Sequence, residues 1–185
     1  MADSRSDEEL MLAVKTGDQV AFAALYNRHK EALLSFCYQM LRNYEDASDV
    51  FQEAFRYLFT HAATYTPSAK FTTYLYHIAR NLCIDILRKR RRWNLRQLEP
   101  EYDVPDAAPA AATRLEDEEV EASLKQALEA VPEPYREVVL LRVTQGLAYE
   151  DIAKITETPL GTVKSRLHTG FELLRQVLKR RKMIE

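Results

Sequence analysis

Residues 148–167 read AYEDIAKITETPLGTVKSRL, and this stretch decides the fold of the C-terminal part of the chain. Ile152, Ala153 and Ile155 recur at the spacing of a short helix, and Val163 and Leu167 continue that spacing after a short interruption. Two short helices joined by so tight a turn predict a helix-turn-helix, whose second helix can lie in the major groove of DNA. A plain helical hairpin with a solvated basic face would have the same spacing and is the alternative.

The second helix of this pair turns a polar face away from its apolar residues. Side chains on that face can donate hydrogen bonds to base edges or to phosphates. We predict DNA contacts from Thr162, Lys164, Ser165, Arg166, His168 and Thr169.

The rest of the chain shows helical periodicity almost throughout, with no convincing alternation of the β-strand type. A loop is expected over Thr64–Lys70, followed by a long helix over Phe71–Arg91. Between Asn94 and Thr113 the periodicity is lost among prolines, alanines and acids. The sequence therefore predicts an all-α protein with helical domains at 1–92 and 119–185, joined by a flexible acidic linker at 93–118.

Charge is unevenly distributed along the chain. The net charge is only −2, yet Arg88–Arg92 and Lys179–Lys182 are unbroken basic runs, and residues 99–121 are strongly acidic. Such separation can present basic faces to a polyanion despite a near-neutral total.

Catalytic and metal-binding patterns are missing from the sequence. Cys37 and Cys83 lie far apart without CxxC spacing, so buried free thiols are favoured over a disulfide or a metal site. The four histidines are scattered. We expect no enzyme activity, no cofactor and no metal. No apolar run approaches the length of a membrane span, so we expect no membrane insertion and a cytoplasmic location.

Three stretches of the C-terminal part resemble a known family. VPEPYREVVLLR at 131–142, GLAYEDIA at 146–153 and PLGTVKSRL at 159–167 are similar to the fourth domain of bacterial sigma factors, especially the extracytoplasmic-function (ECF) group. In that family this domain reads the −35 promoter element and packs on the flap of RNA polymerase. The resemblance assigns DNA contacts to Lys164, Ser165, Arg166 and His168.

Two residues depart from the family pattern in this domain. Glu157 stands where the turn usually carries glycine, which costs about 1 kcal/mol if its φ is positive. Thr169 stands where a basic residue is common, so one DNA contact is in question.

The stretch DASDVFQEAF at 46–55 resembles the polymerase-docking helix of the same family. Its apolar side is expected to be buried and its acidic side exposed, which by itself also fits a merely solubilising surface. The resemblance implies docking on the clamp helices of the large polymerase subunit through Asp46, Asp49, Val50, Gln52, Glu53 and Phe55.

The stretch FTTYLYHIARNLCIDILRKR at 71–90 resembles the family's helix for promoter melting and −10 recognition. Its outward stripe interleaves aromatic rings with cations, which suits single-stranded DNA because bases stack on rings while phosphates meet Lys and Arg. Core packing is the alternative for Tyr74 and Tyr76. The family's loop for a flipped base matches Tyr65–Lys70, and Asn81 matches a position lining that pocket. The implied contacts are Tyr65, Lys70, Tyr74, Tyr76, His77, Arg80, Asn81, Arg88 and Lys89.

The resemblance implies a sigma factor that binds core RNA polymerase, directs it to −35 and −10 promoter elements and helps to open the duplex. The implied partners are core polymerase, promoter DNA and an anti-sigma factor. Linker acids Glu99, Glu101, Asp103 and Asp106 either imitate RNA in the exit channel or form a solvated tether. The alternative function is a helix-turn-helix transcriptional regulator that acts without polymerase.

Overall fold

The computed structural model describes residues 3–96 and 127–180, and every regular element within those ranges is helical. The predicted all-α class is confirmed. The chain divides into two compact units, Met1–Val104 and Pro105–Glu185. From residue 97 onward the predicted linker, including its four acids named above, lies outside the described residues. The domain limits at 92 and 119 stay predictions.

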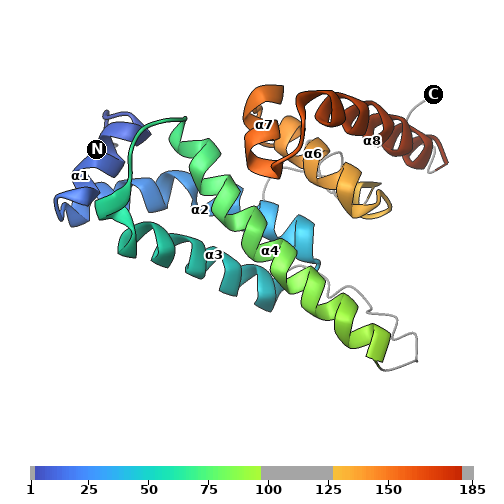
Figure 1. Cartoon of the computed structure of the whole chain (residues 1–185), viewed down its shortest axis with the longest axis horizontal. Helices are drawn as coiled ribbons and strands as arrows, with labels where there is room; N and C mark the ends of the chain where they lie inside the picture. Colours follow the sequence, from blue (N-terminus) through green and yellow to red (C-terminus); the bar gives the residue numbers. More distant parts are fainter. Residues whose placement is uncertain (1–2, 97–126, 181–185) are drawn as a thin grey trace, which may run out of the picture. The chain divides into compact units, whose positions relative to one another are not determined.

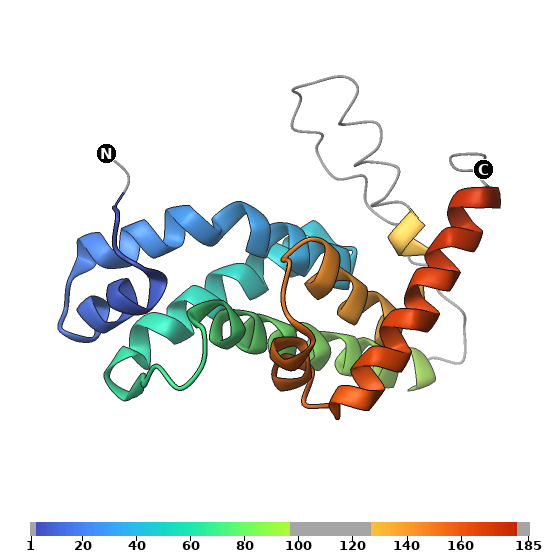
Figure 2. The same ribbon diagram turned by 90° about the horizontal axis from the view of Figure 1, so that it is seen from above.

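The first unit is built around three long helices (Figure 1). Helices α2, α3 and α4 pack on one another, and α1 packs against α2. Figure 2 shows α1 at the same end of this unit as the segment that joins α3 to α4. The elements are α1 (Asp7–Lys15), α2 (Gln19–Leu41), α3 (Tyr44–Thr60), the short 3-10 helix η1 (Ala62–Thr64) and α4 (Phe71–Arg96).

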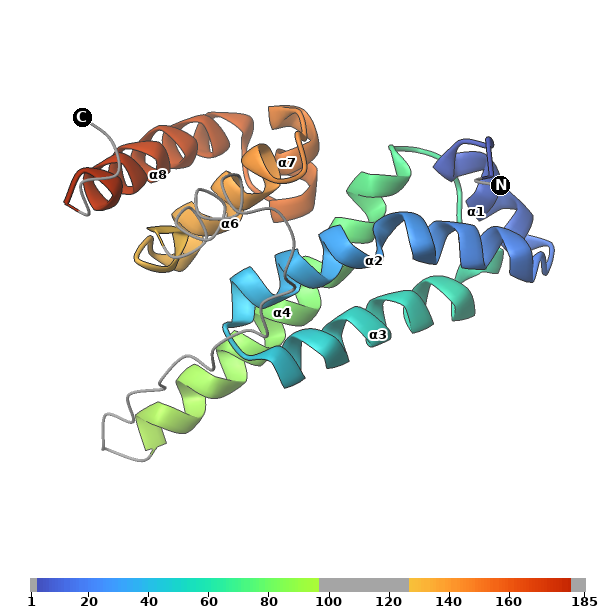
Figure 3. The same ribbon diagram turned by 180° about the vertical axis from the view of Figure 1, so that it is seen from behind.

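The core of the first unit lies between α2, α3 and α4, which run side by side in Figure 3. Each helix contributes residues at helical spacing, and burying a large apolar side chain stabilises the fold by about 1.5–3 kcal/mol. The side chains from these helices with 3% exposure or less include Leu33, Phe36, Met40, Val50, Ala54, Leu58, Leu75, Ala79 and Cys83.

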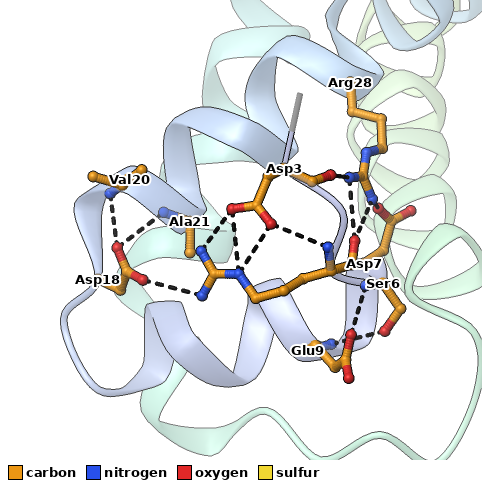
Figure 4. A network of polar contacts seen from close by, with 9 residues as sticks. Asp3, Ser6, Asp7, Glu9, Asp18, Val20, Ala21 and Arg28 are labelled. Atoms are coloured by element: carbon orange, nitrogen blue, oxygen red, sulfur yellow. Dashed lines mark hydrogen bonds and ion pairs between the residues drawn. The ribbon is translucent and has the colours of Figure 1, made fainter. Parts of the chain in front are cut away.

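Local capping residues set where the first helices begin. Ser6 and Glu9 form a reciprocal capping box at α1, and the Asp18 carboxylate accepts hydrogen bonds from Val20 and Ala21 at α2 (Figure 4). Asn43 caps α3 by accepting from the Asp46 amide at 2.9 Å.

Helix α4 begins at Phe71 as predicted but ends at Arg96 rather than Arg91. Leu75, Ile78 and Ala79 on this helix are buried, whereas Leu82 and Ile86 are only half-buried. The helix continues past its last buried residues because straight-chain basic residues have good helix propensity.

The second unit contains the helix-turn-helix. Its elements are α6 (Glu133–Val143), α7 (Tyr149–Thr156) and α8 (Leu160–Arg180). Gly146 follows α6 with a φ of +62°, the left-handed conformation that glycine adopts without strain, and this glycine lies in the turn after the helix ends at Val143.

The turn between α7 and α8 is closed by a left-handed residue. Glu157 has a φ of +53°, and the Thr158 amide donates to the Ala153 carbonyl at 3.1 Å. This is the usual hydrogen-bond pattern of a helix that ends in the left-handed region. The positive φ considered for Glu157 is therefore confirmed.

Gly170 allows α8 to approach α6 closely. A Cβ at this position would lie 2.6 Å from Val139 Cγ2 and 3.2 Å from the Tyr135 carbonyl oxygen. No larger residue fits without a shift of one helix or of Val139, so the absence of a side chain at Gly170 sets the distance between the helices.

Candidate nucleic-acid interface

The first turns of α8 present the side chains predicted to read duplex DNA. Val163 is fully buried and Leu167 is 2% exposed, so the opposite side of the helix faces outward. The outward residues are Lys164, Ser165 and His168, which are exposed, and Thr162, Arg166 and Thr169, which are half-buried.

Arg166 differs from its neighbours because it already has a carboxylate partner. Its Nη1 lies 3.4 Å from Oε1 of Glu137 on α6, whose side chain is only 3% exposed. The guanidinium offsets a buried negative charge that would otherwise be costly. A phosphate or base contact by Arg166 therefore competes with a contact inside the unit, whereas none of the described ion pairs involves Lys164.

The outward stripe of α4 combines aromatic, amide and cationic groups. Tyr74, His77 and Asn81 are half-buried, and Asp85 and Arg88 are exposed. These residues lie on one side of the helix because they are spaced three or four apart.

Hydrogen bonds fix the Asn81 amide within that stripe. Arg80 Nη1 donates a hydrogen bond to Asn81 Oδ1 at 3.2 Å. On the other side of the amide, Asn81 Nδ2 lies 3.3 Å from His77 Nε2. An amide held in one orientation can offer a defined donor and acceptor to a base edge.

Two tyrosines predicted to contact DNA are buried. Tyr76 is 1% exposed, and its ring packs edge-on against Phe36 at 5.2 Å between centroids. Tyr65 is 4% exposed, and burial raises the pKa of its hydroxyl to about 12. The placement of these two rings at the DNA surface was wrong, and for Tyr76 the core-packing alternative holds. Tyr74 is half-buried, and its ring centroid lies 5.5 Å from that of Tyr65. Of these three tyrosines, Tyr74 is the one that remains on the outward stripe of α4.

The loop before α4 exposes its tip and buries its base. Thr66, Pro67, Ser68 and Lys70 are exposed, whereas Tyr65 reaches inward. Lys70 places a positive charge at the start of α4, as the −10 prediction requires.

Helix α3 turns a polar face outward, as the docking prediction requires. Asp49 and Gln52 are exposed and Glu53 is half-buried. Hydrogen bonds from Arg56 lower the pKa of the Glu53 carboxyl, the Nε contact measuring 2.7 Å. Val50 and Phe55 are each 3% exposed, so their assignment as direct polymerase contacts was wrong, and they anchor the helix to the core.

Arg90 has a structural role that the sequence pattern did not reveal. It donates to the Leu41 carbonyl at 2.9 Å and to the Asp46 carboxylate, joining the end of α4 to the turn between α2 and α3. Within an unbroken basic run nothing distinguishes it from its neighbours. Asp46, predicted to bind polymerase, is thus already paired.

The described histidine, cysteine and acidic side chains form no metal-binding cluster. Within residues 3–96 and 127–180 no cluster of three or more His, Cys, Asp or Glu side chains could hold a metal ion. Cys37 and Cys83 are free and buried. The Cys83 thiol donates a hydrogen bond to Cys37, and this bond together with burial raises the pKa of Cys83 well above its usual value. No helix in the described ranges has the length and apolar character needed to cross a bilayer.

Comparison with known proteins identifies both units. Residues 25–93 match the Sigma-70 region 2 family, and residues 121–174 match the Sigma-70 region 4 family. The ECF RNA polymerase sigma factor SigW of Bacillus subtilis is 34% identical over 90% of this chain and 93% of its own length. The ECF RNA polymerase sigma-E factor of Escherichia coli is 30% identical over 94% of this chain and 95% of its own.

Solved structures of sigma factors share the fold. The sigma factor RpoE of Bartonella quintana, solved with the anti-sigma factor NepR, gives a TM-score of 0.71 at 25% identity over 85% of this chain and 96% of that one. CnrH, solved with the cytosolic domain of CnrY, gives the same TM-score at 20% identity over 95% of this chain and 99% of that one. With SigW of Bacillus subtilis 34% identical across nearly the whole of both chains, this chain belongs to the extracytoplasmic-function group of bacterial RNA polymerase sigma factors.

Proposed function

We propose that this sigma factor binds core RNA polymerase and places it on promoters through two different DNA contacts. The exposed face of α8 reads the −35 element as duplex, and the α4 stripe with the preceding loop holds one strand of the −10 element. Opening of the duplex then needs no bond chemistry, because the free energy of strand capture offsets the cost of unpairing a few bases.

The observation that carries this proposal is the stripe on α4. Tyr74, His77 and Asn81 bring a ring, an imidazole and a fixed amide to one half-buried surface beside exposed Arg88. A reader of duplex grooves does not need such a surface, whereas a single strand exposes both base faces and base edges to it. A regulator that acts without polymerase would bind duplex DNA through α8 and would have no use for the stripe on α4.

The polar face of α3 is the proposed contact with polymerase. Asp49, Gln52 and Glu53 face outward over a helix anchored by Val50 and Phe55. Charged and amide groups on a rigid helix suit an interface whose specificity comes from electrostatic complementarity.

An anti-sigma factor is the proposed regulatory partner. RpoE of Bartonella quintana was solved with such a protein, and this chain shares its fold at 25% identity. A partner that covers the exposed faces of α3 and α8 would block polymerase and promoter together.

Lys164→Ala tests the duplex contact. We expect weaker binding of the assembled holoenzyme to a −35 duplex, with the salt dependence reduced by about one counterion if a phosphate is contacted. Lys179→Ala, which removes a lysine from the last turn of the same helix, is the matched control. Equal losses in the two variants would show general charge attraction in place of a specific face.

Asn81→Ala tests the strand contact. We expect reduced binding to DNA that is premelted over the −10 element and unchanged binding to the −35 duplex, because Asn81 belongs to the first unit and α8 to the second.

A pull-down with core polymerase at low salt distinguishes a sigma factor from a regulator that acts without polymerase. Failure of the wild-type chain to bind polymerase would favour the independent regulator.

A further inference from the structure

Helix α1 lies outside the residues that match the Sigma-70 region 2 family, yet it contacts both ends of the loop before α4. At the first end, Lys15 Nζ donates a hydrogen bond to the Tyr65 carbonyl at 3.1 Å. At the second end, the Phe71 amide donates to Oε1 of Glu8 at 2.7 Å. Two side chains of one short helix therefore hold the main chain on either side of the exposed tip.

Glu8 supplies the cap that the local sequence of α4 lacks. The first amides of a helix have no acceptor within the helix, and a side-chain oxygen just before the helix usually supplies one. Here Ala69 and Lys70 precede Phe71, and neither has a side-chain acceptor. The Glu8 carboxylate takes that role from 63 positions away, and its negative charge also suits the positive end of the helix.

Helix α1 is itself fixed to the core. One carboxylate oxygen of Asp7 lies 2.7 Å from His29 Nε2. The other oxygen pairs with Arg28 (Figure 4). The His29 ring is 9% exposed, and its centroid lies 5.4 Å from the centroid of the fully buried Phe71 ring. These contacts tie α2, α1 and the first residue of α4 together, so the anchors of the loop rest on a rigid support.

The anchored loop determines what the DNA would meet. Tyr65 and Phe71 are held at the two ends of the exposed Thr66–Ser68 tip. Tyr74 lies one turn into α4, with its ring centroid 5.5 Å from that of the buried Tyr65. We propose that Glu8 and Lys15 are positioning residues that hold this loop in the shape that binds an unpaired base, without touching DNA themselves. The proposal rests on the function above, in which the loop and α4 hold a strand of the −10 element.

The test compares variants of the full chain assembled with core polymerase. The probes are a promoter fragment made non-complementary over its −10 element and a −35 duplex of equal length. Glu8→Ala and Lys15→Met remove the two anchors, while Glu8→Gln and Lys15→Arg keep an acceptor and a donor. Glu9→Ala is the matched control, because it removes the carboxylate of the α1 capping box and leaves both loop anchors intact.

We expect Glu8→Ala to weaken binding to the premelted probe about threefold to tenfold, the range set by loss of one helix cap. Lys15→Met should act in the same direction, binding to the −35 duplex should not change, and Glu8→Gln should restore most of the affinity. Equal affinity of Glu8→Ala and wild type for the premelted probe would overturn the proposal, as would an equal loss in Glu9→Ala.

Amide hydrogen exchange at Phe71 tests the positioning role a second time and needs no DNA. The Phe71 amide should exchange faster in Glu8→Ala than in wild type or Glu9→Ala, because its acceptor is gone. Unchanged exchange would overturn the positioning role. If the wild-type holoenzyme fails to bind the premelted probe, the proposed strand contact falls, and exchange at Phe71 still decides whether α1 sets the loop.

Discussion

Glu157 occupies the left-handed turn between α7 and α8, where its Cβ crowds the following carbonyl. We predict that Glu157→Gly stabilises the second unit by about 0.5–1 kcal/mol, because relief of strain exceeds the added freedom of the unfolded chain. Urea denaturation measures the change. Glu150→Gly, in the right-handed first turn of α7, is the control and should instead destabilise by about 1 kcal/mol. A loss of stability in both variants would contradict the strain at Glu157.

Arg166 combines a contact inside the second unit with the DNA contact proposed for it. Removing it by Arg166→Ala leaves the 3% exposed Glu137 carboxylate without this cation, so we predict a loss of about 1–2 kcal/mol in unfolding free energy. Lys164→Ala should leave stability within about 0.5 kcal/mol of wild type. Adding Glu137→Gln to Arg166→Ala should recover part of the loss, and a purely additive double variant would show that the pair is not coupled.

The packing of α8 on α6 depends on one missing side chain. Gly170→Ala places a Cβ 2.6 Å from Val139 Cγ2, and we predict a loss of about 1–3 kcal/mol in unfolding free energy. Gly161→Ala has open space within 4 Å and is the control, with unchanged or slightly raised stability. Val139→Ala should cost less in the Gly170→Ala background than in wild type, because it removes the methyl group that clashes. Equal costs would argue against the close approach.

At the level of elements, the sequence predicted helix limits better than what each helix contacts. Asn43 and Gly146 act on their own neighbours, so their capping roles could be inferred from local sequence. The Glu8 cap joins residues 63 positions apart, and no local pattern signals it. The burial of Tyr76 could have been foreseen, because residues two apart point about 200° apart around a helix and Tyr74 already lay on the stripe.

For the molecule as a whole, the buried thiols report on opening of the first unit. Cys37 and Cys83 have no exposed surface, and the raised pKa of Cys83 keeps its thiol protonated at neutral pH and above. Because the thiolate is the reactive form, we predict that neither cysteine reacts with a thiol reagent at pH 8 until the unit opens. The reaction rate should rise with urea in step with unfolding. Rapid labelling of the native protein would show that α2 and α4 separate freely.

The contact between Arg90 and Asp46 joins the helix proposed to bind DNA to the helix proposed to bind polymerase. Asp46 belongs to the helix proposed to meet polymerase, and Arg90 belongs to the helix proposed to meet DNA. A ligand that competes with Arg90 for the Asp46 carboxylate would free one more cation on α4. Linkage is reciprocal, so a strand that recruits Arg90 would strengthen the proposed polymerase binding by the same factor. Through this pair, the proposed holoenzyme assembly and promoter capture would form one thermodynamic cycle.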